Sequence, residues 1–473
     1  MVKILIVEDE EDFFESIQKV FDENGLDCEI TWARSKETAI SEAERQFFDL
    51  TILDQKIPTL DGALDAHVDH GRAAWDTMFE CSPGMPVLIL TALSADDIID
   101  TVVRRNENQR IWGGEEKFPT VDHLRKVDFD RFPTKIIAYA NAVQALKDVE
   151  FQLPAGLELE EQHKRLCALF ARRIKGVRCD VRRLSGGLSG SAVYRVMVFD
   201  NNGARIQNAV LKIGSKQMVE TERSNLQLMD RLAAVATPRF LETLYYGAKN
   251  MAAIAYQLAD GYEQNVFDLL DERHDDLPKA LQCITDQRQN WVNATSERRA
   301  TVGEIRRLVL SDESVETIVQ DYELVWIGGF EAREIQVHWG CIHGDFHGEN
   351  ILLNEELVPV FIDYGDVKEG PTALDWMTLE NSTFFHPSAP GFEQAVIDSV
   401  RPEKWASVEE YCCIESLGVF ISECRKRAEV EGLYKRELVA SAYSYVLRQL
   451  KYPDTDKELA VALLEGLRAT FDE

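Results

Sequence analysis

The sequence predicts two folded parts in series: an α/β part built on a doubly wound, five-stranded parallel sheet, and an α+β part composed of two lobes. The first part is indicated by short apolar segments that alternate with amphipathic helical segments and end on acidic or hydroxyl residues. The second is indicated by a glycine-rich turn after residue 180 and by a polar loop, residues 341–350, inside an apolar region. Regular alternation of strands and helices is typical of a parallel sheet, whereas strands followed by a run of helices are typical of α+β domains.

Length and composition restrict the class of protein. The chain has 473 residues, more than one hydrophobic core usually organises, and 45% of them are hydrophobic, as in ordinary globular proteins. The net charge of −30 disfavours binding to the phosphate backbone of a nucleic acid. No apolar run approaches the roughly 18 residues of a membrane span, and no secretory signal is apparent. Nine cysteines without a Cys-x-x-Cys pair predict reduced thiols and a cytoplasmic protein.

Apolar segments in the first third of the chain predict strands at residues 2–7, 28–31, 50–53 and 87–90. Amphipathic segments between and after them predict helices that end near Gly25, span 35–46 and span 133–146. Three of the strands lead directly into polar residues, which are Glu8 and Asp9, Asp54, and Thr91. Because the carboxyl ends of parallel strands meet at one edge of a sheet, these side chains are expected to lie together. Three carboxylates repel one another unless a divalent cation neutralises them, which predicts a Mg²⁺ site.

These residues make the first part similar to the receiver domains of two-component systems, over residues 1–148. The resemblance implies a flavodoxin-like fold, with Asp54 as the aspartate that accepts a phosphoryl group. It also implies that Glu8, Asp9 and Asp54 hold Mg²⁺ and that the Thr91 hydroxyl senses the phosphoryl group. A histidine kinase or a phosphotransfer protein is the partner that such a domain implies.

The lysine that receiver domains place beside the phosphoryl group has two candidates, Lys117 and Lys126. We favour Lys126, because His123 lies three positions before it, where receivers carry an aromatic or histidine switch residue. The sequence departs from the family in the valine that follows Lys126, where a proline is usual, and in the long segments 61–72 and 101–121. A receiver-like fold that has lost phosphorylation is the alternative for this part.

Residues 149–179 are predicted to form a helical linker. Residues 153–156 break the preceding helix, and residues 157–174 have the pattern of a charged amphipathic helix. Packing of this helix on the lobe that follows is the favoured interpretation. A coupling or dimerisation helix is the alternative, and it leaves a homodimer open. The apolar face consists of Leu159, Leu166, Leu169 and Phe170.

The remaining part, residues 180–473, begins with a predicted small lobe that ends near residue 260. Its glycine-rich turn lies between strands predicted at 180–184 and 192–198. Glycines let backbone N–H groups approach phosphate oxygens, because no Cβ stands in the way. The nucleotide-binding candidates in this turn are Gly186, Gly187, Ser189, Gly190 and Ser191.

Lys212 interrupts the apolar strand predicted at 209–213. A buried lysine needs an anion, which nucleotide phosphates and a glutamate of the following helix can supply. Glu222 is favoured over Glu220, because the apolar residues that follow recur at helical spacing from Glu222 and place it on the inward face.

The predicted catalytic loop lies within residues 341–350. Asp345 and Asn350 are short polar side chains on this loop, and a hairpin predicted at 351–353 and 358–362 brings Asp363 next to them. Phosphoryl transfer from a nucleotide needs a carboxylate to take the proton of the acceptor hydroxyl, and an amide and a second carboxylate on Mg²⁺. These three residues supply that set.

The motifs His-Gly-Asp-x-His-x-x-Asn and Ile-Asp-Tyr-Gly make this part similar to the aminoglycoside phosphotransferase and choline kinase branch of the protein-kinase-like superfamily. The resemblance implies a bilobal protein-kinase-like domain whose large lobe begins near residue 261. It implies that Asp345 is the catalytic base and that Asn350 and Asp363 are the metal ligands.

The same resemblance implies further roles. Lys212 and Glu222 would orient the phosphates of ATP, and the apolar strand predicted at 251–258 would form the hinge beside the adenine, although it does not distinguish ATP from GTP. His343 and Asp375 would have structural roles, with Asp375 anchoring the catalytic loop.

The acceptor is not revealed by the sequence. Residues 262–340 are predicted to be helical and carry no recognisable motif, and helices are predicted from residue 375 onward.

The favoured function is an ATP- and Mg²⁺-dependent phosphotransferase that acts on a hydroxyl of an unidentified small molecule or protein and is controlled by aspartyl phosphorylation of its receiver domain. A kinase-shaped module that binds nucleotide and a partner protein is the first alternative, and transfer of a nucleotidyl group is the second. The enzyme is favoured because the sequence keeps the base and both metal ligands.

Overall fold

The computed structural model describes residues 1–92, 107–186, 191–229, 231–232, 236–389, 400–432 and 434–472. It divides into two compact units, which are Met1–Val219 with Phe240–Gln257, and Glu220–Arg239 with Leu258–Glu473. Both domain boundaries expected from the sequence, after residues 148 and 179, fall inside the first unit and stay predictions.

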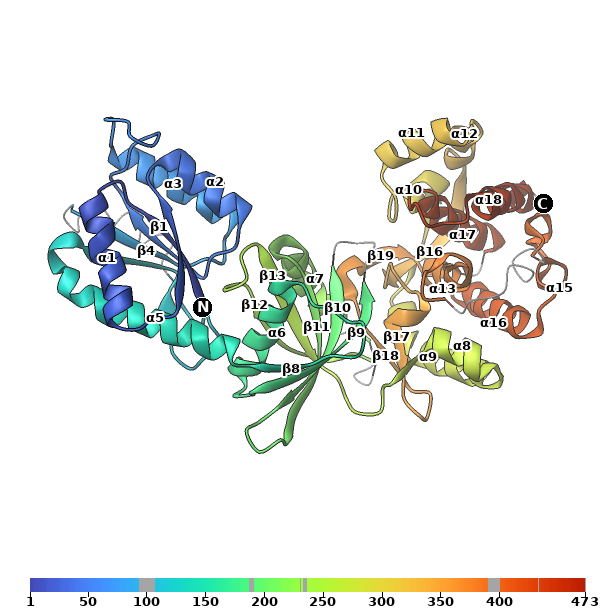
Figure 1. Cartoon of the computed structure of the whole chain (residues 1–473). Helices are drawn as coiled ribbons and strands as arrows, with labels where there is room; N and C mark the ends of the chain where they lie inside the picture. The colour runs from blue at the N-terminus through green and yellow to red at the C-terminus, as the bar shows by residue number, and fades with distance from the viewer. Residues whose placement is uncertain are drawn as a thin grey trace. The chain divides into compact units, whose positions relative to one another are not determined.

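The first unit begins with a five-stranded parallel sheet (Figure 1), which confirms the predicted fold class. Its strand order is β2-β1-β3-β4-β7. The strands are β1 (Val2–Val7), β2 (Cys28–Ala33), β3 (Leu50–Asp54), β4 (Val87–Thr91) and β7 (Val121–Arg125). The flanking helices are α1 (Glu11–Glu23), α2 (Lys36–Arg45), α3 (Val68–Cys81) and α5 (Phe132–Lys147).

Strand β1 shows why this sheet is covered on both faces. Ile4 and Ile6 belong to a core that includes residues of α1 and α5, whereas Leu5 and Val7 belong to a second core that includes residues of α2 and α3. Successive side chains of a strand point to opposite faces, so the continuous apolar stretch from Ile4 to Val7 must be buried on both.

The first unit continues into a six-stranded sheet with the order β12-β13-β11-β10-β9-β8. Strands β9 and β10 flank the glycine-rich turn, β11 carries Lys212, and β13 is the predicted hinge strand. The strands are β8 (Glu150–Gln152), β9 (Arg178–Gly186), β10 (Ala192–Phe199), β11 (Arg205–Ser215), β12 (Arg239–Leu244) and β13 (Met251–Gln257).

The predicted linker helix, α6 (Glu161–Arg173), is buried between the two sheets. Leu166, Leu169 and Phe170 belong to one hydrophobic core together with residues of α5 and of strands β9, β10, β11 and β13. Packing on the small-lobe sheet is therefore the interpretation that the structure favours, and the same helix also contacts the receiver.

The described part of the long segment before β7, residues 107–120, contacts α6. This part contains the short strands β5 (Asn108–Gln109) and β6 (Phe118–Pro119). The Arg110 Nη2 donates a hydrogen bond to the Arg173 carbonyl oxygen of α6 at 2.9 Å. The insertion is thus a structural connection between the receiver and the linker helix.

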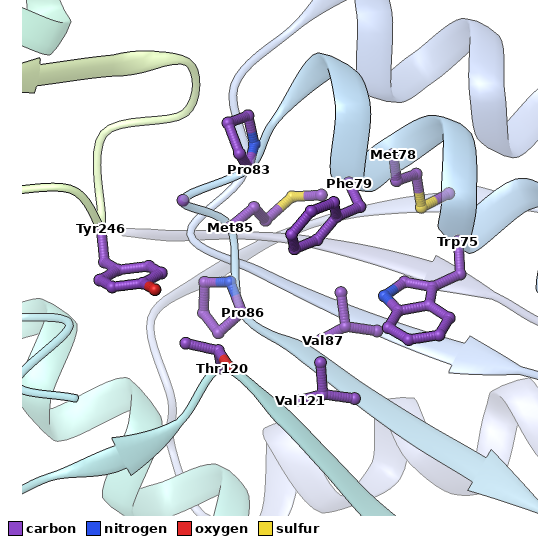
Figure 2. A pocket seen from close by; sticks show the side chains of 11 residues that line it. Trp75, Met78, Phe79, Pro83, Met85, Pro86, Val87, Thr120, Val121 and Tyr246 are labelled. Carbon is purple, nitrogen blue, oxygen red and sulfur yellow. The ribbon is translucent and has the colours of Figure 1, made fainter. Parts of the chain in front are cut away.

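The turn between β12 and β13 contacts the receiver from the small-lobe side. The N–H of Gly247 donates to the carbonyl oxygen of Gly84 at 2.9 Å, and the N–H of Gly84 donates to the carbonyl oxygen of Lys249 at 3.1 Å. Figure 2 shows Tyr246 beside a small apolar pocket formed by the α3–β4 turn and by residues of α3, β4 and β7. The Tyr246 hydroxyl donates to Glu107 Oε2 at 2.8 Å.

The second unit is mainly helical. Helix α7 (Lys216–Met229) begins in the first unit and continues into the second. The further helices are α8 (Val266–Glu272), α9 (Leu277–Val292), α10 (Val302–Arg306), α11 (Asp312–Asp321), α12 (Ile327–Glu331), α13 (Ala373–Phe385), α15 (Val408–Tyr411), α16 (Glu415–Gly432), α17 (Lys435–Gln449) and α18 (Lys457–Asp472).

The described part of the second unit also contains two small sheets. Strands β17 (Ile351–Leu353) and β18 (Pro359–Phe361) form the predicted hairpin, and β14 (Gln264–Asn265) pairs with β17. The all-helical prediction for residues 262–340 is wrong, because β15 (Ser296–Thr301) and β16 (Glu334–Ile342) form a sheet with β19 (Lys368–Pro371). Strand β16 leads directly into the catalytic loop.

None of the helices in the described part of the chain has the length and apolar character that crossing a membrane requires. All nine cysteines are free thiols.

Candidate functional sites

The carboxyl edge of the parallel sheet carries an acidic pocket. One carboxylate oxygen from each of Glu8, Asp9 and Asp54 lies within 4.8 Å of the others. The Lys126 Nζ donates to Glu8 Oε2 and to Asp54 Oδ2, both at 2.8 Å. Lys117 is exposed. The structure therefore brings Lys126, and not Lys117, to the acidic residues.

Burial shifts the pKa values of the side chains in this pocket. It raises the pKa of Glu8 to about 7, and the negative charge of Asp54 adds to this shift, while Lys126 opposes it. Burial also raises the pKa of Asp54. For Lys126, burial lowers the pKa, but the charges and hydrogen bonds of Asp54 and Glu8 outweigh this and leave it raised. Raised pKa values mean that the negative charges of these carboxylates are unfavourable without a cation. Mg²⁺ would neutralise them and prefers oxygen ligands, so the residues fit the predicted ion.

The predicted switch residues lie on the strands next to this pocket. Thr91 ends β4 and is buried, and its hydroxyl donates to Gln55 Oε1 at 3.1 Å. His123 lies on β7 and is exposed. Gln55 was not predicted to belong to this site, although its position directly after Asp54 places it at the same edge of the sheet. Phe13 was also missed, and its ring centroid lies 4.2 Å from Lys126 Nζ.

The predicted catalytic loop, residues 341–350, is held by contacts of its backbone to Asp375. The N–H of His343 donates to Asp375 Oδ2 at 2.9 Å, and the N–H of Gly344 donates to Oδ1 at 3.0 Å. The His343 Nε2 contacts the carbonyl oxygen of Ile362 at 3.0 Å, which ties the loop to the end of β18. These contacts agree with the structural roles expected for His343 and Asp375.

Arg288 supports this arrangement from α9. Its side chain is fully buried, and Nη1 lies 2.7 Å from Asp375 Oδ2, while Nη2 lies 3.3 Å from Glu431 Oε2. The Arg288 guanidinium carbon lies 4.7 Å from the ring centroid of Phe346, a residue of the catalytic loop. The sequence contains no local signal for Arg288 or Glu431, since they come from helices far along the chain.

The predicted base, Asp345, is paired with an arginine from α17. Arg448 Nη2 lies 2.8 Å from Asp345 Oδ1. Burial raises the pKa of Asp345, but the charge of Arg448 and hydrogen bonds from His347 and Arg448 outweigh burial and bring the pKa well below its ordinary value of 3.8. Asp345 is therefore a carboxylate at every physiological pH. Arg448 was not predicted from the sequence.

Asn350 lies beside Asp345 and is fully buried. Its Nδ2 donates to the Asp345 carbonyl oxygen at 2.9 Å, which orients the amide. Among the described residues, Oδ1 of Asn350 has no hydrogen-bond partner. A buried amide oxygen normally has a partner, so this atom fits the ligand position predicted for Mg²⁺.

Asp363 follows the hairpin at the predicted place. The N–H of Ile362 donates to the Asn350 carbonyl oxygen at 3.0 Å, so the residues just before Asp363 lie against the catalytic loop. Asp363 has φ of 65° and ψ of 72°, in the left-handed region. A non-glycine residue in such a conformation carries roughly 1–3 kcal/mol of strain and is most often found at functional sites.

The small-lobe candidates lie on the predicted elements. Lys212 is buried on β11 of the first unit, and Glu222 is buried on α7 in the second unit, so their pairing stays a prediction. Gly186 ends β9, and Ser191 is buried just before β10. Gly187, Ser189 and Gly190 lie outside the described residues.

Two family models match the chain. The model of the response regulator receiver domain matches residues 4–110, and the model of the phosphotransferase enzyme family matches residues 180–411. None of the curated proteins compared with the chain matches it.

Solved structures of both kinds are similar to parts of the chain. A thermostable mutant of aminoglycoside phosphotransferase APH(4)-Ia in its apo form is 16% identical and has a TM-score of 0.38, over 62% of this chain and 94% of that chain. A CheY-like receiver domain protein from Methanospirillum hungatei JF-1 is 17% identical with a TM-score of 0.23, over 30% of this chain and 97% of that chain. The receiver domain of the sensor histidine kinase PA1611 from Pseudomonas aeruginosa PAO1 is 21% identical with a TM-score of 0.21, over 29% of this chain and 98% of that chain.

The matches to the family models agree with the positions of the acidic pocket and of the catalytic loop. The chain therefore combines a response regulator receiver domain with a kinase-like domain of the phosphotransferase enzyme family.

Proposed function

We propose that the kinase-like domain transfers the γ-phosphoryl group of ATP to a hydroxyl of a small molecule or a protein, and that phosphorylation of Asp54 controls this activity. The observation that carries the proposal is the loop of residues 341–350, in which Asn350 Nδ2 donates to the Asp345 backbone carbonyl oxygen and, among the described residues, Asn350 Oδ1 has no hydrogen-bond partner. We place the domains at residues 1–148 and 180–473, with the linker between them.

Asp345 is suited to take the proton of the acceptor hydroxyl. Arg448 keeps its carboxylate deprotonated, and the backbone contacts to Asp375 fix the loop that carries it. A base fixed in this way orients the hydroxyl and removes its proton as the phosphoryl group arrives.

Asn350 and Asp363 would hold Mg²⁺, and Lys212 with Glu222 would orient the nucleotide phosphates. When bound, the ion neutralises the negative charge that builds up on the phosphates during transfer. The strain at Asp363 supports this role, because a strained residue is kept where its side chain is needed.

The test is ATP consumption by the full chain in the presence of pools of acceptors, with Asp345→Asn as the control. Asparagine has the shape of aspartate but cannot take a proton, so activity should fall by about 100-fold or more. Equal consumption by the two proteins would contradict the assignment of Asp345.

A second candidate is a signalling module that binds nucleotide and a partner without turnover. The ion pair between Arg448 and Asp345 favours it, because one oxygen of the base is already occupied. In that case wild type and Asp345→Asn both bind ATP with Mg²⁺, and neither consumes it with any acceptor.

Control by the receiver is proposed from the pocket around Asp54. A phosphoryl group on Asp54 would compete with the contact between Asp54 and Lys126, so the pocket must rearrange when it is present. A histidine kinase or a phosphotransfer protein is the proposed donor, and the nine free thiols suit a cytoplasmic location.

Beryllofluoride, which mimics the phosphoryl group, should change the rate of ATP consumption or the assembly state of the wild-type chain. Asp54→Asn should show no such response. An unchanged rate and assembly state in wild type would contradict control by Asp54.

A further inference from the structure

Three side chains with metal-binding groups lie beside the catalytic loop and have no role in the proposed reaction. They are His347, Glu349 and His386, which we call the His–Glu–His cluster. One ligand atom from each lies within 4.8 Å of the others. His347 and Glu349 belong to the loop, whereas His386 directly follows α13, so the cluster connects two separate segments of the second unit.

The geometry of the cluster is close to that of a metal site. The rings of His347 and His386 are stacked, with centroids 4.2 Å apart and an interplanar angle of 29°. His386 Nε2 lies 3.8 Å from Glu349 Oε2. Two ligands of one tetrahedral zinc ion lie about 3.3 Å apart, given metal–ligand distances near 2.0–2.1 Å. Side-chain movements that shorten the distances between the ligand atoms by roughly 0.5–1.5 Å would therefore close the cluster around an ion.

His347 provides an independent indication of a ligand. Its side chain is only 8% exposed, and among the described residues its Nδ1 has no hydrogen-bond partner. Its other ring nitrogen, Nε2, lies 3.5 Å from Asp345 Oδ2. With a cation on Nδ1, the proton would sit on Nε2 and face this carboxylate. Histidines that bind metals usually donate their second N–H to a carboxylate or carbonyl in this way.

Binding would change one contact of His347. Asn350 Nδ2 lies 3.1 Å from His347 Nε2, and a proton on Nε2 would end this contact. Asn350 would keep its hydrogen bond to the Asp345 carbonyl oxygen, because that bond uses the backbone of Asp345.

His386 is kept neutral. Burial lowers its pKa to about 3, and the neighbouring His347 adds to this shift. Its contact with Glu349 is therefore no ion pair at neutral pH, and neutral imidazole is the form that binds metal ions. The Ser388 N–H donates to His386 Nδ1 at 3.2 Å. Binding through Nε2 would move the ring proton to Nδ1 and break this exposed hydrogen bond.

We infer that the His–Glu–His cluster binds a divalent transition-metal ion of the zinc type. Two imidazole nitrogens and one carboxylate favour Zn²⁺ or Co²⁺, whereas Mg²⁺ requires oxygen ligands. Three protein ligands leave a fourth position open, as in sites where zinc also binds water or a substrate. The inference does not depend on turnover of ATP.

The test is titration of the metal-free full chain with Co²⁺ in excess Mg²⁺, followed by the visible absorption of the bound ion. Wild type should bind one Co²⁺ at this site with an absorption typical of nitrogen ligands. His386→Asn and Glu349→Gln should each bind at least about 100-fold more weakly, since even groups outside the ligand set contribute about 10–100-fold. Unchanged binding in both variants, or displacement of Co²⁺ by Mg²⁺, would overturn the inference.

The matched control is His67→Ala. His67 and His70 form another histidine pair, with ring centroids 6.0 Å apart, and His67 is exposed. Co²⁺ bound there would disappear in His67→Ala and persist in His386→Asn, which would also overturn the inference. Thermal unfolding without metal shows whether each variant is folded, and the rise of Tm on adding Co²⁺ should occur in His67→Ala but not in His386→Asn.

Discussion

At the scale of single residues, Arg448 decides at which pH the proposed base works. Its charge holds the pKa of Asp345 low, so Arg448→Gln should raise that pKa. A carboxylate base is inactive when protonated. The low-pH loss of kcat/KM should therefore move to higher pH in Arg448→Gln, and Arg448→Lys should restore part of the wild-type profile. Profiles measured at temperatures where each variant stays folded provide the check, and an unshifted profile would contradict the role of Arg448.

Glu8 makes Mg²⁺ binding by the receiver sensitive to pH. The pKa of Glu8 is raised to about 7, so below that pH a proton must leave before the ion can bind. Mg²⁺ affinity should fall by up to about tenfold for each pH unit below 7. Calorimetric titration of the full chain at pH 6 and pH 8 measures this difference. Because the kinase-like domain also binds Mg²⁺ in this proposal, Asp54→Asn serves as the reference for the receiver site, and equal affinities at the two pH values would be the contrary result.

At the scale of elements, Glu437 introduces a buried acid where α17 packs against β16. It is fully buried, and its Oε2 accepts a hydrogen bond from the His338 N–H at 3.0 Å. Burial raises its pKa to about 8 from 4.5. A raised carboxyl pKa means that the folded state holds a proton that the unfolded state releases, so stability falls as the pH rises from about 4.5 through 8.

Glu437→Gln should remove this dependence. At pH 9 the variant should be more stable than wild type by an amount on the order of a few kcal/mol, because it has no proton to lose. At pH 4, below both pKa values, the two proteins should be nearly equal, because the carboxyl group is then protonated in the folded and in the unfolded state. Tm measured at both pH values gives the comparison, and a loss of stability at pH 9 would show that the carboxylate itself is needed.

The sequence predicted best those elements whose pattern is local. Strands such as β1 and β3 are buried on both faces, so each is visible as a short segment made mostly of apolar residues. Strand β15 was missed because four of its six residues are exposed and charged or polar, and a charged segment between helices has no strand signal of its own. It becomes a strand only by pairing with β16.

The same distinction explains the sites. Asp345, Asn350 and Asp363 come from one short stretch whose spacing is set by the loop and hairpin, so their proximity follows from the sequence. Arg448 contacts Asp345 and Arg288 contacts Phe346 of the same loop, both from helices far away along the chain. Their contacts depend on tertiary packing, which no local pattern records.

At the scale of the whole chain, the first unit joins the receiver to the small-lobe sheet through one core. Asp49 directly precedes the receiver strand β3 and is buried, with Oδ1 at 2.5 Å from Arg165 Nη1 of the linker helix. The Arg165 side chain also donates to the carbonyl oxygen of Gly247 in the small lobe. Helix α6 therefore contacts both the receiver and the small-lobe sheet through this one side chain.

Asp49→Asn should strongly weaken this connection. The variant leaves Arg165 charged, buried and without its carboxylate, which typically costs about 3–5 kcal/mol. The matched control is Glu161→Gln, since Glu161 forms an exposed ion pair with Lys3 and should contribute about 0–1 kcal/mol. Denaturant unfolding compares the two, and equal effects would show that the buried pair does not stabilise the first unit.

The central claim is that the kinase-like domain adds a phosphoryl group to a hydroxyl. Mass spectrometry of the acceptor pools after incubation with ATP, Mg²⁺ and the full chain tests it most directly. The proposal predicts an acceptor that gains the mass of one phosphoryl group with wild type and gains none with Asp345→Asn. An acceptor that gains a nucleoside monophosphate, or pools left unchanged while the chain binds ATP with Mg²⁺, would contradict it.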